Sequence, residues 1–251
     1  MSTGQLLPGS EGDRLEALAP DQLVLGIAWY AVFLFSTTCH EAAHAWAAKR
    51  GGDPTAYVGG QVSLDPRPHI RREPFGLVLV PLLSWALGGW MIGWASTPFD
   101  PHWAERWPRR AAWMSLAGPA ANLVLLLLAG LAIRGGVELG WLAPPLVARF
   151  GQIAVGEGSA FVSSLALLLS VLFTLNLLLL SFNLLPLPPL DGAGALPLLL
   201  GERASAVWQR LLRQPVVAIL GLVLAWNLFG PIFARVHRFA LDVLYSGLRF
   251  E

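Results

Sequence analysis

Charged side chains are scarce in this chain. Of its 251 residues, 13% are Asp, Glu, Lys or Arg, whereas an ordinary soluble domain carries about 25%. Hydrophobic residues make up 55%, and apolar runs of roughly 17 to 25 residues, long enough to cross a bilayer, recur along the sequence. This composition predicts an integral membrane protein that crosses the lipid bilayer several times.

Other common features are also missing. Cys39 is the only cysteine, which excludes an internal disulfide framework and a zinc site built from several cysteines. The net charge of +1 gives no indication of a nucleic-acid partner. The polar N-terminal segment, residues 1–20, lacks a basic start followed by an apolar core, so we expect no cleaved signal peptide. The main expected partner is therefore the lipid bilayer.

Five segments are long and apolar enough to be membrane-spanning helices: residues 22–48, 75–95, 111–133, 161–185 and 216–233. We predict an all-α polytopic membrane protein with about five to six transmembrane helices. After the first span, the stretch AYVGGQVSLD (residues 56–65) has short β-branched runs around a Gly-Gly pair and could form a small β-hairpin. Residues 201–251 predict an additional transmembrane helix and an amphipathic C-terminal tail over 237–251.

The first apolar segment ends in the pentad HEAAH, residues 40–44. On a helix, positions four apart lie on one face, so His40 and His44 can hold one metal ion between them. Glu41 projects about a quarter-turn away, where a carboxylate can take a proton from a metal-bound water without binding the ion itself. The alternative is a structural histidine pair, but ionisable groups at mid-helix in a span cost at least about 2.5 kcal/mol each. The pattern therefore favours a zinc ion with Glu41 as the general base.

A hydrolytic zinc site usually has three protein ligands, so the third must come from another part of the chain. Asp191 is the strongest candidate, because it follows the helix-breaking stretch PLPPL, residues 186–190. Non-helical backbone at membrane depth is tolerated only where it is buried in protein or lines a wet cavity. The alternative is a solvent-facing Asp-Gly turn at a helix end. The remaining histidines, which we expect near water in loops or the tail, are His69, His102 and His237.

Two asparagines lie in apolar sequence near these groups, Asn122 in AGPAANLVL and Asn183 in SFNLLPLP. A neutral amide can hold a substrate backbone or stabilise the oxyanion that develops during amide hydrolysis. The alternative is an interhelical hydrogen bond, which is common for Asn in membrane helices. Both interpretations stay open for Asn122, whereas the nearby Asp191 favours the functional one for Asn183. Packing suffices to explain Asn176 and Asn227.

Together these motifs resemble the site-2 protease family of intramembrane zinc metalloproteases. The matching pieces are HEAAH at 40–44, AGPAAN at 117–122 and NLLPLPPLDG at 183–192. The last piece fits the family pattern N-x-x-P-x-P-x-L-D-G at every specified position. The order and spacing of the pieces agree as well. The chain is most similar to the compact subgroup that has neither a PDZ nor a CBS domain.

The resemblance implies a site for one zinc ion. The implied ligands are His40, His44 and Asp191. Glu41 would be the general base, and Asn183 and Asn122 would assist the substrate or its oxyanion. Residues 21–200 would form the catalytic core of the enzyme.

The resemblance also implies a function. An intramembrane zinc metalloprotease hydrolyses a peptide bond within or near the transmembrane segment of a membrane-protein substrate, and we expect this one in a prokaryotic cell membrane. Two alternatives remain. A membrane zinc transporter would need further ligands along a path through the bilayer, and a catalytically silent scaffold would normally have lost a ligand or the base.

Overall fold

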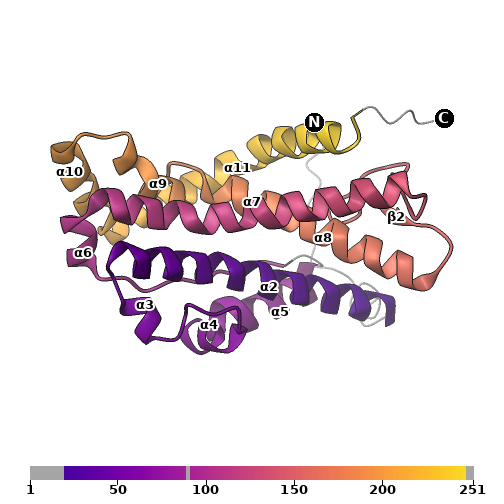
Figure 1. The fold of residues 1–251 in the computed structure, drawn as a ribbon, viewed down its shortest axis with the longest axis horizontal. Coiled ribbons are helices and arrows are strands. Elements are labelled where there is room, and N and C mark those ends of the chain that lie inside the picture. The colour runs from indigo at the N-terminus through magenta and orange to yellow at the C-terminus, as the bar shows by residue number, and fades with distance from the viewer. Residues whose placement is uncertain (1–19, 89–90, 247–251) are drawn as a thin grey trace, which may run out of the picture.

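The computed structural model describes residues 20–88 and 91–246, so the predicted polar segment 1–20 lies almost entirely outside the described residues (Figure 1). The described part is mostly helical. Within it, four helices are long and apolar enough to cross a membrane: α2 (Pro20–Gly51), α7 (Pro108–Glu138), α8 (Ala160–Asn183) and α11 (Pro215–Leu244). These helices confirm the prediction of a mostly helical protein with several candidate membrane spans, although four long ones are found among the described residues in place of five to six.

Helices α2, α7 and α8 pack against one another along their lengths (Figure 1). Phe33 of α2 shares a buried apolar cluster with Val171 of α8, and Ile133 of α7 shares another with Phe173 of α8. Between membrane helices, close van der Waals packing and interhelical hydrogen bonds drive association, because lipid is as apolar as the side chains. These three helices form the frame that holds the candidate site.

The stretch after α2 forms short helices, so the prediction of a β-hairpin over residues 56–65 is wrong. The helices are α3 (Thr55–Val58) and α4 (Pro66–Arg72). Asp53 accepts hydrogen bonds from the amide and the hydroxyl of Thr55, at 2.9 and 2.5 Å. Asp65 caps α4 by accepting from the Arg67 amide at 3.0 Å. Aspartates that bond to the following backbone favour helix starts and turns over strands.

A two-stranded antiparallel sheet does occur, in the connection between α7 and α8. Strand β1 (Leu142–Ala143) pairs with β2 (Val155–Gly156), with Leu142 opposite Gly156. The sheet lies at one end of the helix bundle, where it closes that connection (Figure 1).

The expected second span, residues 75–95, is shorter in the structure. Its helical part consists of a π-helix (Phe75–Leu79) and α5 (Val80–Gly88). After two residues that are not described, the 91–100 segment runs back without regular secondary structure. The Trp94 amide donates to the Gly76 carbonyl at 3.1 Å, and a Cβ added to Gly93 would overlap the same carbonyl. The returning chain therefore lies directly against the start of this short helix.

Prolines interrupt the helical chain after α8. Helix α8 ends at Asn183, and Pro186, Pro188 and Pro189 follow in a non-helical stretch. Three short elements come next: α9 (Asp191–Ala195), a 3-10 turn (Leu196–Leu198) and α10 (Glu202–Leu212). Helical structure thus begins again at Asp191, in a separate short helix.

Helix α11 continues further than the sequence predicts. It runs through Pro231 to Leu244, so the first half of the expected amphipathic tail, from His237 onward, belongs to the helix. Residues 247–251 of that tail lie outside the described residues. An internal proline does not end the helix, because membrane helices tolerate the freed backbone groups.

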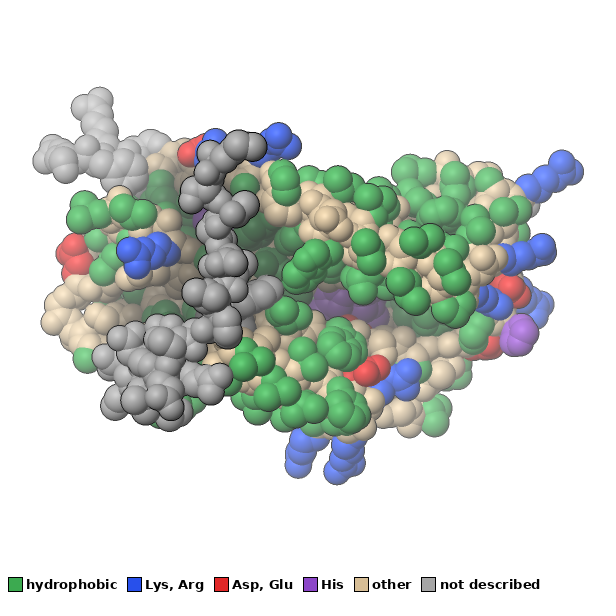
Figure 2. All heavy atoms as spheres, turned by 180° about the vertical axis from the view of Figure 1, so that it is seen from behind, with side chains coloured by type: hydrophobic (Ala, Val, Ile, Leu, Met, Phe, Trp, Pro, Cys, Tyr) green, Lys and Arg blue, Asp and Glu red, His purple; other side chains and the backbone are tan. Residues whose placement is uncertain are grey.

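The outer surface matches a membrane environment. Apolar side chains cover much of the face in Figure 2, and several Lys and Arg side chains gather at one end of it. On α11, Ile219 and Leu220 are 62% and 63% exposed. At the end formed by α10 and α6 (Pro101–Arg106), Arg213 pairs with Glu105 at 3.0 Å. An exposed apolar surface with charges at its end suits helices in a bilayer.

Candidate metal centre and catalytic base

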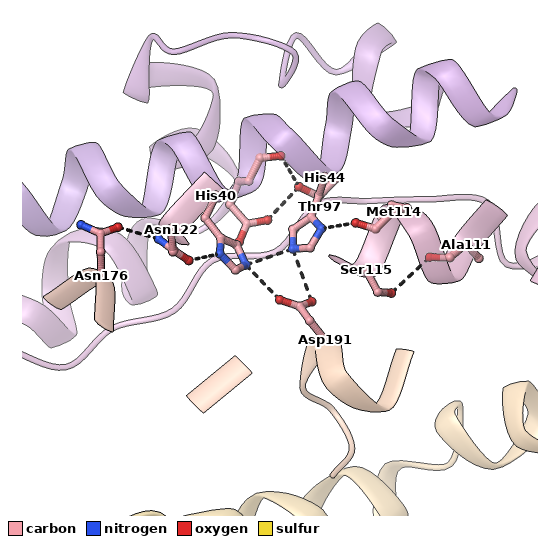
Figure 3. A network of polar contacts seen from close by, with 10 residues as sticks. His40, His44, Thr97, Ala111, Met114, Ser115, Asn122, Asn176 and Asp191 are labelled. Atoms are coloured by element: carbon pink, nitrogen blue, oxygen red, sulfur yellow. Dashed lines mark hydrogen bonds and ion pairs between the residues drawn. The ribbon is translucent and has the colours of Figure 1, made fainter. Parts of the chain in front are cut away.

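Two histidines one turn apart on α2 meet one aspartate at the start of α9 (Figure 3). The Nε2 atoms of His40 and His44 are 2.9 Å apart. Asp191 approaches both, with Oδ2 3.1 Å from His40 Nε2 and Oδ1 3.3 Å from His44 Nε2. The structure therefore brings together the three residues that the sequence selects as ligands, although Asp191 is 147 residues from His44 and 151 from His40 in the chain.

The proline-containing stretch delivers Asp191 to the histidines. Gly192 is buried against the carbonyls of Leu184 and Leu185, and an added Cβ would overlap both. The Trp208 indole of α10 donates to the Ala193 carbonyl at 2.8 Å and holds α9 from the other side. The Asp191 side chain is 20% exposed, which excludes the alternative of a solvent-facing turn.

In each histidine, the hydrogen bond made by Nδ1 determines whether Nε2 has a free lone pair. His44 Nδ1 lies 2.7 Å from the Met114 carbonyl of α7, and a carbonyl oxygen can only accept a hydrogen bond. Nδ1 of His44 must therefore carry the proton. Its Nε2 is left unprotonated in the neutral ring and faces Asp191 and His40, as a metal ligand should.

A chain of buried amides fixes His40 in the same way. The Asn176 amide nitrogen donates to the Leu172 carbonyl (2.8 Å) and to Ser36 Oγ (2.9 Å), so Asn176 Oδ1 must face Asn122. Asn122 Nδ2 donates to that oxygen at 2.8 Å, and Asn122 Oδ1 accepts from His40 Nδ1 at 2.5 Å. His40 Nε2 is thereby left unprotonated too. We call Asn122, Asn176 and Ser36 the amide relay.

The amide relay bears on two sequence predictions. Both polar groups of Asn122 are engaged and the residue is fully buried, which favours an interhelical hydrogen bond over direct contact with a substrate. Asn176, which the sequence assigned to packing, is also fully buried and links α8 to both α2 and α7. A buried amide inside an otherwise apolar helix was the signal for Asn176, but its partners were not visible in the sequence.

The donor set fits one zinc ion. Tetrahedral zinc holds its ligand atoms about 2.0–2.1 Å away, which separates neighbouring ligand atoms by about 3.3 Å. The three donor pairs here are 2.9, 3.1 and 3.3 Å apart. Two imidazole lone pairs and a carboxylate that face one another repel unless a cation lies between them. Three protein ligands of this kind leave a fourth position open, as in hydrolytic zinc sites.

Helix α7 forms the wall of the site next to the histidines. A Cβ added at Gly118 would overlap the Nε2 atoms of both His40 and His44. Only glycine fits at this position of the AGPAAN motif, because an added Cβ would lie 2.5 Å from His40 Nε2 and closer still to His44 Nε2.

Glu41 lies beside the ligand group, also on α2, and is 5% exposed. Its Oε2 accepts a hydrogen bond from the Thr97 hydroxyl of the 91–100 segment at 2.7 Å. Glu41 is thus close to the site without belonging to the three-residue ligand group, which agrees with the geometry expected of a general base. The sequence did not single out Thr97.

The remaining candidates do not belong to the three-residue ligand group. Asn183 is partly buried at the end of α8 and its side chain has no hydrogen-bond partner among the described residues, so its role stays a prediction. His69, expected near water, is instead buried, and its Nε2 donates to the Ser63 carbonyl at 3.0 Å. His237, expected outside the spans, lies within α11. Among the described residues, the one group of three or more potential ligands is His40, His44 and Asp191.

Comparison with known proteins identifies relatives of the chain. Residues 28–226 match the model of "Peptidase family M50". The chain is 35% identical over 161 residues to "Putative zinc metalloprotease YwhC" of Bacillus subtilis, which covers 63% of each protein. It is 34% identical over 208 residues to "Putative zinc metalloprotease Rip2" of Mycobacterium tuberculosis, which covers 82% of this chain and 70% of that protein.

The shared region is only part of these relatives. The chain spans 63% of the length of the Bacillus protein and 54% of the length of the Rip2 protein of Mycolicibacterium smegmatis, to which it is 35% identical over 166 residues. No solved structure matched the chain.

Proposed function

Because the chain belongs to peptidase family M50, we propose that it is an intramembrane zinc endopeptidase that hydrolyses a peptide bond within or near the transmembrane segment of a membrane-protein substrate. One observation carries the proposal. Two imidazole lone pairs and the Asp191 carboxylate converge on one point, and a buried glutamate lies next to them. These groups are the metal ligands and the general base that a hydrolysis with water as the nucleophile requires.

When bound, zinc lowers the pKa of its water to about 7 and polarises the substrate carbonyl. Glu41 takes the proton of the attacking water on its carboxylate and later gives it to the nitrogen of the leaving amide. The water oxygen would bond to the carbonyl carbon first, and the carbon–nitrogen bond would break once the nitrogen has received the proton, so that one peptide bond yields one carboxyl and one amino group. His40, His44 and Asp191 would hold the ion throughout.

The asparagines would have different tasks in this reaction. Asn122 would orient His40 through Nδ1, as its hydrogen bond supports. Asn183 would contact the substrate backbone or the developing oxyanion, which its partial burial near the start of α9 permits.

The four long apolar helices support a substrate that lies in the membrane. We propose that the shorter apolar helix Phe75–Gly88 also enters the bilayer, giving five membrane helices. Residues 21–200 would then form the catalytic core and residues 201–251 an additional helix. A membrane helix must unwind locally before its amide can be attacked, because its own hydrogen bonds shield the carbonyl.

Two substitutions test the proposal in the purified full chain. Glu41→Gln keeps the size of the side chain and should retain zinc but abolish cleavage of single-span membrane substrates. Asp191→Ala removes a ligand and should lower the zinc content. Cleavage by the Glu41→Gln variant would rule out Glu41 as the base, and full zinc retention by Asp191→Ala would mean that the third ligand is another residue. Zinc transport is not favoured, because the described residues contain no second ligand group along a path.

A further inference from the structure

We propose that Thr97 is a positioning residue for the catalytic base: its hydroxyl holds one carboxylate oxygen of Glu41 and turns the other toward the reacting water. The inference rests on the peptidase function proposed above. It concerns a residue outside the three sequence motifs, in the 91–100 segment that crosses beside α2.

Thr97 has two acceptors for a single hydrogen. Its Oγ1 lies 2.7 Å from Glu41 Oε2 and 2.9 Å from the backbone carbonyl of the same residue. A hydroxyl has one proton to donate, and a carboxylate is the stronger acceptor at the shorter distance. The proton therefore points mainly to Oε2, and the carbonyl is a second, weaker acceptor of the same hydrogen.

The hydrogen bond between Thr97 and Glu41 is buried, so little water can replace it. Glu41 is 5% exposed and Thr97 is 8% exposed. In the described parts of the chain, Glu41 forms no salt bridge with Lys or Arg, and Thr97 is the one side chain that donates a hydrogen bond to it. Without such a donor, a buried carboxylate costs free energy, and its side chain has no hydrogen bond that fixes its orientation. The remaining oxygen, Oε1, has no partner among the described residues and is the one available to water.

The 91–100 segment is held in place independently of the site. Ser96 Oγ donates to Glu73 at 2.5 Å, next to Thr97. The Asp100 amide donates to Asp53 Oδ2 at 2.8 Å, on the other side. Thr97 is thus presented to Glu41 by a segment anchored on both sides, which is what a fixed position for the base requires.

Three variants of the full chain test the role. Thr97→Val keeps the shape and removes the hydroxyl, whereas Thr97→Ser keeps the hydroxyl. Thr174→Val is the matched control, because the buried Thr174 hydroxyl of α8 has no hydrogen-bond partner within the described residues. The assay measures zinc content, kcat and KM with fluorescently labelled single-span membrane peptides that carry Gly, Asn or Pro within the span.

We expect Thr97→Val to lower kcat by about 10–100-fold, the usual effect of removing a residue that orients an active-site group. The KM and the zinc content should not change, and Thr97→Ser should restore kcat. Thr174→Val should behave as the wild type. Wild-type kcat in Thr97→Val would overturn the inference, and so would loss of zinc, which would tie Thr97 to the metal ligands instead. Thr97→Ala replaces the valine variant if the latter does not accumulate.

A measurement without substrate separates this inference from the proposed function. Acetohydroxamate chelates active-site zinc and passes its hydroxyl proton to a neighbouring base. Its affinity should fall in Glu41→Gln and in Thr97→Val, and recover in Thr97→Ser. Absence of wild-type cleavage of every peptide would count against the proposed function alone. Equal acetohydroxamate affinity in the wild type and Thr97→Val would count against the role of Thr97 alone.

Discussion

Helices α2, α7 and α8 differ sharply from α11, although all four are apolar enough to span a membrane. In the most apolar stretches of α2, α7 and α8, 44%, 39% and 44% of the residues are buried, against 11% in α11. The first three helices are joined by buried hydrogen bonds between polar side chains, such as the amide relay. Asn227 of α11, in contrast, donates to the Val223 carbonyl of its own helix. Helices of similar hydrophobicity therefore have different roles: α2, α7 and α8 pack together and hold the candidate site, whereas most of α11 is exposed, as suits a surface that faces lipid.

Gly221 is among the few residues of α11 that are buried against the rest of the protein. A Cβ added at Gly221 would overlap the carbonyl of Pro188, in the stretch that delivers Asp191. Helix α11 thus supports the metal site at one place while most of its length faces outward.

The largest effect is expected from Gly118→Ala. The new methyl group would occupy the space between His40 and His44, so zinc content should fall to near zero and cleavage should be lost. Gly135→Ala in the same helix is the control, because nothing lies within 4 Å of its added Cβ. Metal analysis of both purified variants measures the difference. A Gly118→Ala protein with full zinc would contradict the close approach of α7 to the ligands.

Asn122→Leu should have the next largest effect. Without the acceptor for Nδ1, His40 loses its fixed orientation, and zinc affinity should fall by about 10–100-fold. Asn227→Leu makes the same chemical change on the exposed face of α11 and should leave zinc affinity unaltered. Competition with a chelator of known affinity compares the two. Equal affinities would mean that the amide relay does not act on the metal site.

Gly221→Ala should have a moderate effect. Overpacking against Pro188 should lower stability by about 1–3 kcal/mol and should weaken zinc binding by moving Asp191. Gly230→Ala, on the same helix with nothing within 4 Å of its Cβ, should be neutral. Thermal unfolding in detergent and zinc titration measure both changes. A neutral Gly221→Ala would show that α11 does not support the site at all.

The smallest effect is expected from Leu220→Ala on the exposed face of α11. The side chain is 63% exposed, so its removal leaves no cavity, and the change in stability should stay within about 0.5 kcal/mol. Unfolding in detergent is the measurement. A loss above that range would reveal a packing partner for this face.

The ligands could be found from the sequence because local rules govern them. His40 and His44 depend on helix periodicity, and Asp191 follows a proline break that is visible in the sequence. The residues that orient these groups could not be found. Asn176 and Thr97 act through partners 54 and 56 residues away, and one sequence does not reveal such contacts.

The errors in the predicted fold have local and long-range causes. The stretch 56–65 has short β-branched runs around a Gly-Gly pair, as a hairpin would, but Asp53 and Asp65 organise its ends into helical turns. The second span is shortened by the 91–100 segment, which returns along the start of its helix. Hydrophobicity measures whether a segment tolerates lipid, and it does not say where the chain turns back.

In the proposed peptidase, the position of His40 within α2 would set the depth in the membrane at which the peptide bond is cut. Gly51 is eleven positions after His40, and Lys49 and Arg50 are exposed at that end of the helix. At a rise of about 1.5 Å per residue, this is about 16 Å, roughly half of the ~30 Å hydrocarbon thickness. A substrate that spans this depth as a helix needs about eleven residues, whereas an extended one, at about 3.3 Å per residue, needs about five. The distance of the cleaved bond from the membrane boundary of a substrate would therefore report how far its helix has unwound.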